Sequence, residues 1–418
     1  MEHKAATASL PIEQFHPTRV VIPLRQGLAP PCVPTVDIGQ SVKIGQLIGQ
    51  PQDGRGPRIH TGVAGTVTAI APHPVIEGEE VLSVTIQSDQ SGRRESPLPH
   101  QDDTPAGRVA LMDQAGLIGM GGAGFPTARK FSAILSPDVS IHQILINGCE
   151  CEPFLTCDHR LMLQMADQVI RGAEEMSRIA GVPVTLCVEA NKPDAIAALQ
   201  TAARNSGVTV LTLQDRYPQG GERQLIQAVW GQEVPAGKLP ADIGVLVSNV
   251  ATTAAFGDAL DGKPLTHRII TVSGQVSRPA NLLAPVGTLL SDLLGYTGGC
   301  IESDGAVRQF LAGGPMTGRW LDNLEVPMTK TTGGFLVLPS VRDPEQPCIR
   351  CGACARVCPS RLMPFAIDRA VIAGDLSTCA DYQAQQCIAC GSCSFVCPAK
   401  RFLAARVSLV RNTLRRQS

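Results

Sequence analysis

The sequence predicts a multidomain α/β protein with small β modules and a cysteine-rich, α-helical module at the C-terminal end. Three observations support this fold class. The N-terminal region has short strands separated by turn residues, the central region alternates apolar strands with helical stretches, and one cysteine pattern occurs twice near the C-terminus. A chain of 418 residues is long enough for about three domains.

Composition places the chain among ordinary packed proteins. Charged residues make up 17% and hydrophobic residues 44% of the sequence, which excludes a disordered or fibrous chain. The formal net charge of −1 argues against a nucleic-acid-binding protein. The first residues, MEHKAATASLPIEQFHPT, contain no apolar signal core, and no run of about 18 apolar residues occurs. We therefore expect a reducing cytoplasmic compartment and no membrane-spanning segment.

The two cysteine runs share the spacing C-x2-C-x2-C-x3-C-P. Three closely spaced thiolates converge on one [4Fe-4S] cluster, and the fourth cysteine, beyond three more residues, reaches the other cluster. Structural zinc sites use two separated pairs of ligands, so zinc is the weaker alternative. The predicted ligands are Cys348, Cys351, Cys354 and Cys397 for the first cluster, and Cys387, Cys390, Cys393 and Cys358 for the second.

Small residues between these cysteines favour the iron–sulfur interpretation. Such residues let backbone amides approach the sulfides and stabilise their negative charge. Clusters of this kind carry single electrons and do no substrate chemistry alone, so the rest of the chain must supply an electron source, a sink or both. The small residues are Gly352, Ala353, Ala389, Gly391 and Ser392.

Residues 19–90 are expected to form a small β module. Residues 36–49 and 58–70 look like the two halves of a barrel-sandwich hammerhead of the biotinyl or lipoyl kind. A carrier domain of that kind presents a modified lysine at a hairpin tip. Lys43 is the only lysine of this module and lies in a different context, VKIGQ, so we interpret the module as structural and unmodified.

The remaining N-terminal segments are expected to be a tail over residues 1–18 and a polar, proline-containing linker over residues 91–106. From residue 107 to residue 265, apolar strands alternate with helical stretches, which is the pattern of an α/β domain. The expected strands are 143–146, 184–188, 209–213 and 243–247, and the expected helices are 160–180 and 192–205, the second preceded by Asn191 as its cap.

A glycine-rich stretch precedes the first of these strands. It reads GMGGAGFPT from Gly119 and includes Gly121, Gly122 and Gly124. Successive glycines let main-chain amides face a phosphate or a flat ring, and a following helix start adds its positive end. The stretch does not follow a strand, as the dinucleotide-binding fingerprint requires, so taken alone it is weak evidence and an ordinary turn is the simpler interpretation.

The first strand runs into the sequence NGCECEP, which places Asn147, Glu150 and Glu152 at its carboxyl end. Open α/β sheets bind ligands at this edge. Carboxylates in extended backbone beside a proline are suited to hold ribose hydroxyls or the amide of a nicotinamide. The alternative is an acidic surface loop, which this loop by itself favours.

Residues 401–418 combine positive charge with helical spacing of apolar residues. No acidic residue follows Asp381, and Leu403, Val407 and Val410 recur at helical intervals. Two interpretations stay open, a basic amphipathic tail helix and a solvated helix packed on the cysteine-rich module. The basic residues here are Lys400, Arg401, Arg406, Arg411, Arg415 and Arg416.

Four motifs occur together: GMGGAGFPTARK, NGCECEPFLTCDHRLM, YPQGGERQLI from Tyr217, and GVLVSNVATTAA from Gly244. Together they resemble the RnfC family, the soluble NADH-dehydrogenase-type subunit of membrane Rnf or Rsx electron transport complexes, which is related to the flavin- and NADH-binding subunit of respiratory complex I. The resemblance spans nearly the whole chain. It implies a complex-I-flavoprotein-like α/β domain over 107–265, an SLBB-type β-grasp region over 266–335, and a double [4Fe-4S] ferredoxin-like module over 336–400.

The resemblance also implies a binding site. FMN is expected to be held noncovalently over the glycine-rich loop, with NADH as the substrate beside it. Two residues depart from the complex I pattern, because Met120 stands where that family has arginine and Cys149 where it has aspartate. The implied FMN contacts are Gly119, Gly121, Gly122, Gly124, Lys130, Asn147 and Asn249, and the implied nucleotide contacts are Glu150, Glu152 and Glu222.

The function that the resemblance implies is an electron-input subunit. It would pass electrons between NADH, FMN and two [4Fe-4S] clusters to a ferredoxin-like partner subunit, within a complex that couples this transfer to ion translocation. Flavin is required because nicotinamide moves two electrons together while clusters accept one. The implied location is peripheral, on the cytoplasmic side of the cell inner membrane, with membrane contact through other subunits.

Two alternative functions remain. A cobalamin reductase of the propanediol-utilisation type shares the glycine-rich motif and the paired clusters. It begins close to that motif, so the long segment before Gly119 counts against it. The other alternative is an electron-conduit and docking subunit without nucleotide chemistry, which would show cluster absorbance without flavin.

Overall fold

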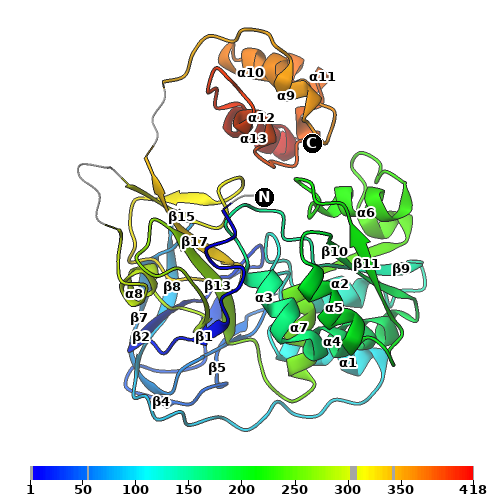
Figure 1. Ribbon diagram of the computed structural model, residues 1–418. Coiled ribbons are helices and arrows are strands. Elements are labelled where there is room, and N and C mark those ends of the chain that lie inside the picture. The colour runs from blue at the N-terminus through cyan, green and yellow to red at the C-terminus, as the bar shows by residue number, and fades with distance from the viewer. Residues whose placement is uncertain (1–2, 54–55, 302–307, 341–343, 418) are drawn as a thin grey trace.

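The computed structural model describes residues 3–53, 56–301, 308–340 and 344–417 (Figure 1). The described chain contains a barrel-sandwich module, an α/β domain, a mixed β-sheet module and a cysteine-rich helical module. Small parts of the expected regions lie outside the described residues, namely 1–2, 54–55, 302–307, 341–343 and 418.

The barrel-sandwich module has the two-sheet architecture expected from the sequence. Its antiparallel sheets, with strand orders β2-β8-β7-β4 and β3-β5-β6, share one apolar core to which Ile22, Ile48 and Val84 contribute. The side chain of Lys43 forms an ion pair with Glu95 of the following linker at 3.8 Å. The strands are β2 Arg19–Pro23, β3 Cys32–Pro34, β4 Ser41–Val42, β5 Leu47–Pro51, β6 Ile59–His60, β7 Gly65–Pro74 and β8 Glu80–Ser88.

The expected N-terminal tail is wrong for the part of residues 1–18 that the structure describes. Strand β1, Ile12–Gln14, pairs in parallel with β14, Ala280–Pro285. Thr7 is fully buried, and its carbonyl accepts a 2.9 Å hydrogen bond from the side chain of Asn281. The segment is part of the fold because it satisfies buried polar groups of a distant module, which no local sequence pattern reveals.

A four-stranded parallel sheet, with order β11-β10-β9-β12, forms the centre of the α/β domain. Apolar cores cover both faces, because Ile144 and Ile146 of β9 pack on one side and Leu145 packs on the other. This double coverage explains why the strands read as continuous apolar runs. The strands, all close to their expected positions, are β9 Gln143–Asn147, β10 Val184–Glu189, β11 Val208–Leu213 and β12 Val245–Asn249.

The helices of this domain differ from expectation in two details. The single helix expected over 160–180 is two helices that meet at Met165, where the backbone leaves helical geometry. The cap of α5 is Lys192 rather than Asn191, and no side chain caps it. The helices are α1 Pro105–Gln114, α2 Thr127–Ala133, α3 Cys157–Gln164, α4 Ala166–Ala180, α5 Pro193–Ala202, α6 Glu222–Trp230 and α7 Val250–Ala259, with the 3-10 helix η1 Pro240–Ile243.

The third module is a six-stranded mixed sheet with order β1-β14-β13-β17-β15-β16. The expected boundary between residues 335 and 336 falls inside β17, Gly334–Pro339, which pairs with both β13 and β15. The module therefore extends to the end of that strand. Its other elements are β13 His267–Gly274, α8 Leu290–Tyr296, β15 Arg308–Ala312 and β16 Arg319–Leu321.

The cysteine-rich module is helical, and its last helix is part of its core. Val407 and Val410 of α13, Leu403–Gln417, are buried and pack with Ile367 of α10 and Ala384 of η2. Of the two interpretations of residues 401–418, the helix packed on the cysteine-rich module is therefore the one that the described residues form. The expectation of a separate basic tail is wrong for these residues. The other helices are α9 Ala353–Arg356, α10 Pro364–Ile372, α11 Leu376–Asp381, η2 Ala384–Gln386 and α12 Ser392–Phe395.

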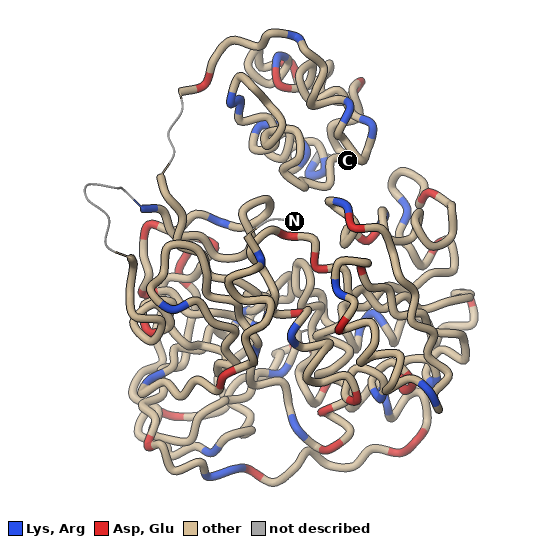
Figure 2. The backbone as a smooth tube through the Cα atoms, viewed as in Figure 1, with Lys and Arg blue, Asp and Glu red and all other residues tan. Residues whose placement is uncertain are grey.

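The cysteine-rich module lies over the α/β domain and the mixed sheet, in orange and red at the top of Figure 1. The hydroxyl of Tyr217 donates a 2.6 Å hydrogen bond to the carbonyl of Cys390. Arg361 forms an exposed ion pair with Glu233 at 3.2 Å. These contacts join the module to one edge of the α/β domain, and Figure 2 shows that Lys and Arg are more frequent in it than Asp and Glu.

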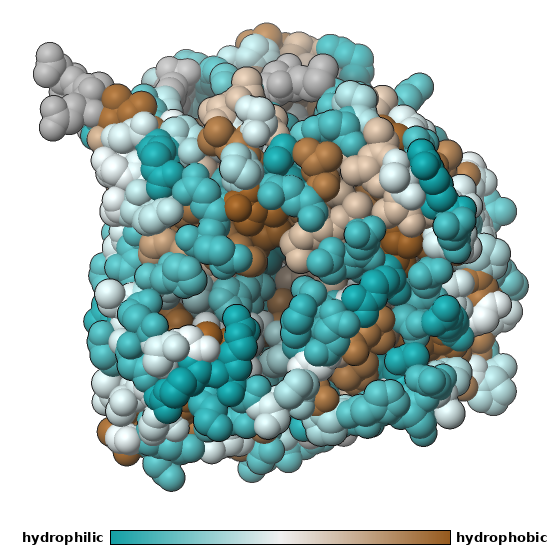
Figure 3. Space-filling view, turned by 60° about the horizontal axis from the view of Figure 1, so that its bottom comes forward, coloured by the Kyte–Doolittle hydropathy of each residue, from teal (hydrophilic) through white to brown (hydrophobic). Residues whose placement is uncertain are grey.

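The opposite face of the molecule, turned forward in Figure 3, carries a cavity of about 560 Å³. Linker residues 94–97, helix α7 and residues 262–269 line it, together with Met120. The side chain of Met120 is buried. Met120, one of the two residues that depart from the complex I pattern, therefore packs into the body of the domain.

Candidate functional site

The carboxyl ends of β9 and β12 bring two predicted site residues together. Asn147 ends β9 and Asn249 ends β12, and the two are paired in register in neighbouring parallel strands. The side chain of Asn147 donates to the carbonyl of Gly220 at 2.8 Å and accepts from the amide of Cys149 at 3.0 Å. The sheet edge, where α/β domains bind ligands, therefore carries two amide side chains side by side.

Asn249 connects this edge to helix α7 and to the partly buried carboxylate of Asp158. Its side-chain oxygen accepts from the amides of Ala251 at 2.9 Å and Thr252 at 3.4 Å, which caps α7. Its amino group donates to Asp158 at 3.1 Å. A Cβ atom at Gly121 would lie 2.6 Å from this amino group, so only glycine permits the close approach of the loop.

The glycine-rich loop leaves space where a ligand is expected. A Cβ atom at Gly122 would meet nothing within 4 Å, and both Gly121 and Gly122 are exposed. Gly124 has a φ of +72° and packs against the backbone of Gly27 in the barrel-sandwich module. The loop is thus held from behind by another module, and its front is open for a phosphate or a flat ring.

Lys130 and Glu222 complete the group at the sheet edge. The ammonium of Lys130, on α2, donates to the carbonyl of Val247 and lies 3.5 Å from the Glu222 carboxylate. Glu222 begins α6 and is exposed. Lys130 therefore places a cation beside the end of β12, and a cation is a group that binds phosphate.

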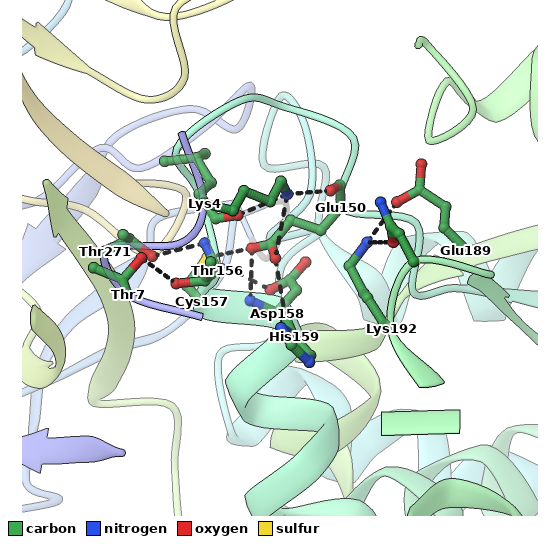
Figure 4. A network of polar contacts seen from close by, with 12 residues as sticks. Lys4, Thr7, Glu150, Thr156, Cys157, Asp158, His159, Glu189, Lys192 and Thr271 are labelled. Atoms are coloured by element: carbon green, nitrogen blue, oxygen red, sulfur yellow. Dashed lines mark hydrogen bonds and ion pairs between the residues drawn. The ribbon is translucent and has the colours of Figure 1, made fainter. Parts of the chain in front are cut away.

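Glu150, the first of the two predicted carboxylates, is turned into the protein (Figure 4). It accepts hydrogen bonds from the amides of Asp158 at 2.8 Å and His159 at 3.2 Å, at the N-terminus of α3, and lies 3.9 Å from Lys4. Burial raises the pKa of this carboxyl, but Lys4, Lys192 and the Asp158 amide outweigh it, so the pKa is below the ordinary value. Its oxygens are therefore already occupied by partners within the chain.

Glu152 is likewise engaged, by a loop of the mixed-sheet module. Its carboxylate accepts from the amide of Met316 at 3.1 Å and from the hydroxyl of Thr317. Burial raises the pKa of the Glu152 carboxyl above the ordinary value despite these bonds. This side chain therefore ties the loop after β9 to the neighbouring module.

Sequence reasoning missed the residues that support these carboxylates. Arg268, on β13, reaches into the α/β domain and lies 3.6 Å from Asp158, while Lys4 donates to the carbonyls of Glu150 and Leu155. Both cations come from segments far from the motifs in sequence, so spacing gave no signal. The acidic and thiol groups at Glu150, Asp158 and Cys157 lie within 4.8 Å of one another, but the two cations already balance the carboxylates.

The eight motif cysteines line two separate cavities, and the sets are those predicted from the spacing. No three of these sulfur atoms, all within the described ranges, lie within 4.8 Å of one another. Tetrahedral zinc would hold them about 3.8 Å apart, so the spread fits a larger inorganic group. The first cavity has Cys348, Cys351, Cys354 and Cys397, and the second has Cys358, Cys387, Cys390 and Cys393.

The backbone around both cavities supplies donors to sulfur. The amide of Arg350 lies 3.4 Å from the sulfur of Cys348, and the amide of Ala389 lies 3.3 Å from that of Cys387. Amides directed at thiolates stabilise the negative charge of an iron–sulfur cluster. The donor set, the spacing and the cavity lining therefore all fit two [4Fe-4S] clusters.

A cleft of about 370 Å³ separates the cysteine-rich module from the sheet edge. Asn191, Asp215 and Tyr217 line it from the α/β side, and Phe395 lines it from the other. The Tyr217 hydroxyl bonds the carbonyl of Cys390 across it, only a few residues from Gly220, the partner of Asn147. The candidate ligand edge and the second cysteine set are thus neighbours.

Family models match all four modules. The Nuo51 FMN-binding domain matches residues 112–257, and the RnfC barrel sandwich hybrid domain matches residues 1–91. The SLBB domain matches residues 269–319, and a 4Fe-4S dicluster domain matches residues 347–401. The expected fold class and cofactors are thereby confirmed, as an FMN-binding domain of the Nuo51 type and a domain for two [4Fe-4S] clusters. The match over residues 1–91 argues against the cobalamin reductase alternative, which begins close to the glycine-rich motif.

Curated relatives match nearly the whole chain. The C subunit of the ion-translocating oxidoreductase complex of Pseudomonas aeruginosa is 40% identical over 87% of this chain and 48% of its own length, so the chain spans about half of that relative. The protein of the same name from Rhodobacter capsulatus is 38% identical over 90% of this chain and 75% of its own length.

A third relative covers the chain almost end to end. The C subunit of the Na(+)-translocating ferredoxin:NAD(+) oxidoreductase complex of Acetobacterium woodii is 37% identical over 98% of this chain and 94% of its own length. In the part of the chain that the structure describes, no helix has the length and apolar character needed to cross a membrane. With four matching modules in order and relatives of this identity and coverage, the chain belongs to the RnfC family of ion-translocating oxidoreductase complexes.

Proposed function

We propose that this chain is the NADH-dependent electron-input subunit of a membrane-bound Rnf-type complex, which exchanges electrons with a ferredoxin-like partner subunit and couples the exchange to ion translocation. The relatives named as ferredoxin:NAD(+) oxidoreductase subunits support this proposal. FMN, when bound, converts between the two-electron chemistry of nicotinamide and the one-electron chemistry of the clusters. The observation that carries the proposal is the bond from Tyr217, beside the sheet edge, to the backbone of Cys390.

The residues of the sheet edge take different parts in this proposal. The amides of the glycine-rich loop and the Lys130 ammonium hold the phosphate of FMN. Asn147 and Asn249, whose side chains are bonded within the chain, fix the backbone of the sheet edge beside it. Glu222, which is exposed at the start of α6, contacts the nicotinamide nucleotide. Glu150 and Glu152 shape the loop after β9 from behind, because their oxygens are bonded within the chain.

The location we propose is the cytoplasmic side of the cell inner membrane, with attachment through the other subunits of the complex. The relatives' names support a complex that moves ions across a membrane. The described helices include none that could cross a membrane, which supports attachment through partner proteins.

Anaerobic reconstitution with iron, sulfide and FMN tests the proposal. NADH titration should bleach first the flavin and then the cluster absorbance. Lys130→Met should weaken FMN binding by about tenfold to a hundredfold, since a hydrogen bond to a charged group is worth about 1.5–3 kcal/mol. Arg129→Met is the matched control, because Arg129 is exposed and lies over the Phe125 ring.

A conduit and docking subunit without nucleotide chemistry is the second candidate. One observation favours it: two of the three predicted nucleotide carboxylates, Glu150 and Glu152, already have partners within the chain. The same titration separates the two functions. Cluster absorbance with no FMN binding and no bleaching by NADH would establish the conduit and overturn the proposed oxidoreductase.

A further inference from the structure

The two cysteine motifs are near-repeats with the same backbone. They read CIRCGACARVCP and CIACGSCSFVCP. Arg350 and Ala389, at the same position, both have a φ of 56°, and Gly352 and Gly391 both adopt the left-handed conformation. Because the backbone is shared, differences in what each motif touches come from side chains and neighbouring modules.

The second motif faces the rest of the chain. Its Cys390 carbonyl accepts the bond from Tyr217, and a Cβ atom at Gly391 would come within 2.5 Å of the Met316 carbonyl. The residues between its first two cysteines, Ile388 and Ala389, are only partly exposed. Its cavity is lined by no charged residue among those that the structure describes. Phe395 of this motif is 75% exposed but lines the cleft toward the α/β domain, so the covered part is the loop between the first two cysteines.

The first motif faces solvent. Cys348, Ile349, Arg350 and Cys351 are all exposed, and 68% of the Ile349 surface is accessible. The Cys351 carbonyl, which corresponds to that of Cys390, accepts a 2.9 Å hydrogen bond from Arg356 of the same module. This motif therefore needs no neighbouring module to satisfy its backbone, and its loop is available for contact.

The charge beside the first motif is positive. The nearest acidic residue along the chain, Glu345, is bonded to Arg406 at 2.7 Å and lies 3.9 Å from Arg401. Asp368 is held by the same two arginines. The module's basic residues are Arg350, Arg356, Arg361, Arg369, Lys400, Arg401, Arg406, Arg411, Arg415 and Arg416, and its described acidic residues are Glu345, Asp368, Asp375 and Asp381.

Resting on the proposed function, we propose that the loop of residues 346–351 is the docking surface for an acidic protein that carries a one-electron centre. Ile349 supplies the apolar contact and Arg350 the complementary charge, beside two exposed cluster ligands. Each docked carrier exchanges one electron. Two carriers are therefore oxidised for each NAD+ that takes up two electrons and one proton, or reduced in the reverse direction.

A protein carrier fits this surface better than a lipid bilayer. The apolar contribution of the loop is limited to Pro347 and to Ile349, which lies between two cluster ligands. An interfacial membrane anchor needs a broad apolar face. A protein that exchanges electrons needs access to the cluster, which the exposure of Cys348 and Cys351 provides.

Binding of a small acidic bacterial ferredoxin to the full-length, cluster-loaded chain tests this surface. Isothermal titration at low salt should show that Arg350→Glu and Ile349→Asp each weaken binding at least tenfold. Arg350→Lys should bind nearly as well as the wild type, because it keeps the charge. The matched controls are Arg369→Glu and Ile372→Asp, which change exposed residues of α10 in the same module and should leave binding unchanged.

Each result has a defined meaning once iron content and visible spectra show that the variants keep both clusters. No ferredoxin binding by the wild type, or equal weakening by Ile372→Asp, overturns the docking surface. Binding to phosphatidylglycerol vesicles that Arg350→Glu abolishes, with ferredoxin binding intact, also overturns it and assigns the loop to lipid. NADH oxidation with ferricyanide tests the proposed function separately. Its absence in the wild type overturns that function, whereas a normal rate in Arg350→Glu with weakened ferredoxin binding supports the docking surface.

Discussion

Arg356 in the first cysteine motif and Phe395 in the second occupy the same position of a shared pattern, and they give the motifs different neighbours. Arg356 bonds the carbonyl of Cys351 within its own module. Phe395 has no donor, and the corresponding carbonyl of Cys390 is bonded by Tyr217 of the α/β domain instead. One side-chain difference thus leaves one motif self-sufficient and exposed, while the other is attached to the flavin domain.

Two copies of one motif can thus give their clusters different neighbours. The cysteine spacing that binds the clusters is the same in both copies, so it cannot decide which cluster faces which partner. The residues between and after the cysteines decide it, because they satisfy or leave open the backbone groups around each cluster. Arg350 in one copy and Ala389 in the other add a difference in charge at the same backbone position.

The largest effect is expected when a cysteine that ligates the cluster of the other run is replaced. Cys358→Ser and Cys397→Ser should each lower the iron content from about eight to about four per chain, since each removes one ligand of one cluster. Cys358→Ser should abolish the same paramagnetic signal as Cys390→Ser, because both residues line the second cavity. If Cys358→Ser instead abolished the signal that Cys351→Ser abolishes, the crossed assignment would be wrong.

A smaller but still large effect is expected from helix α13, which both cavities share. Val407 lines the second cavity and is 1% exposed, so Val407→Asp should destabilise the module by about 3 kcal/mol or more and reduce the second cluster first. Iron content and thermal unfolding followed by cluster absorbance measure both effects. Leu409→Asp is the control, because Leu409 lies on the same helix and is 65% exposed. Equal loss of clusters in the two variants would contradict the packing described for α13.

The contact between the second motif and the α/β domain should contribute the smallest effect on stability. Tyr217→Phe removes one hydrogen bond to the Cys390 carbonyl and should cost about 1 kcal/mol. It should also shift the reduction potential of the second cluster and leave that of the first unchanged. The reason is that hydrogen bonds to the groups around a cluster ligand, here the backbone of Cys390, tune the potential of the cluster that it binds. Tyr296→Phe, which removes an exposed bond to Glu13, is the matched control. A shift in the first cluster alone would contradict the assignment of faces.

Replacing Phe395 by arginine, the residue at this position in the first motif, tests whether this position determines which donor the carbonyl uses. Phe395→Arg should give the Cys390 carbonyl an internal donor, as Arg356 gives Cys351. Tyr217→Phe should then have little further effect in the Phe395→Arg background. Additive effects of the two changes, measured as a double-mutant cycle on the cluster potential, would show that the Tyr217 bond does not depend on this position.

The features predicted from the sequence are those with local signals. The four strands of the α/β domain follow from apolar runs, and the two cysteine sets follow from their spacing. The pairing of Asn147 with Asn249 as site residues is implied by the family resemblance, and the parallel strands whose carboxyl ends meet at one edge explain it. The amphipathic pattern of α13 indicated a helix but left open what its apolar face covers, because periodicity does not identify the partner surface.

The features that the sequence did not reveal depend on contacts between distant segments. Lys4 lies at the start of the chain and pairs with Glu150, and Arg268 on β13 pairs with Asp158. Glu152 has the residue type and position of a ligand-binding carboxylate, yet its oxygens are bonded to the loop at Met316. The identity of a residue gives its chemistry, but only the fold determines whether that chemistry is already used inside the protein.

Paramagnetic relaxation by a soluble dysprosium chelate measures how near each cluster lies to solvent, so it tests whether the first cluster is exposed and the second is covered. The two cluster signals of the reduced, full-length chain are first assigned with Cys351→Ser and Cys390→Ser. The chelate should strongly enhance relaxation of the signal lost in Cys351→Ser and affect the signal lost in Cys390→Ser much less, since the first loop is exposed and the second is covered by Tyr217 and Met316. Equal enhancement of both signals, or stronger enhancement of the second, would contradict this difference in exposure.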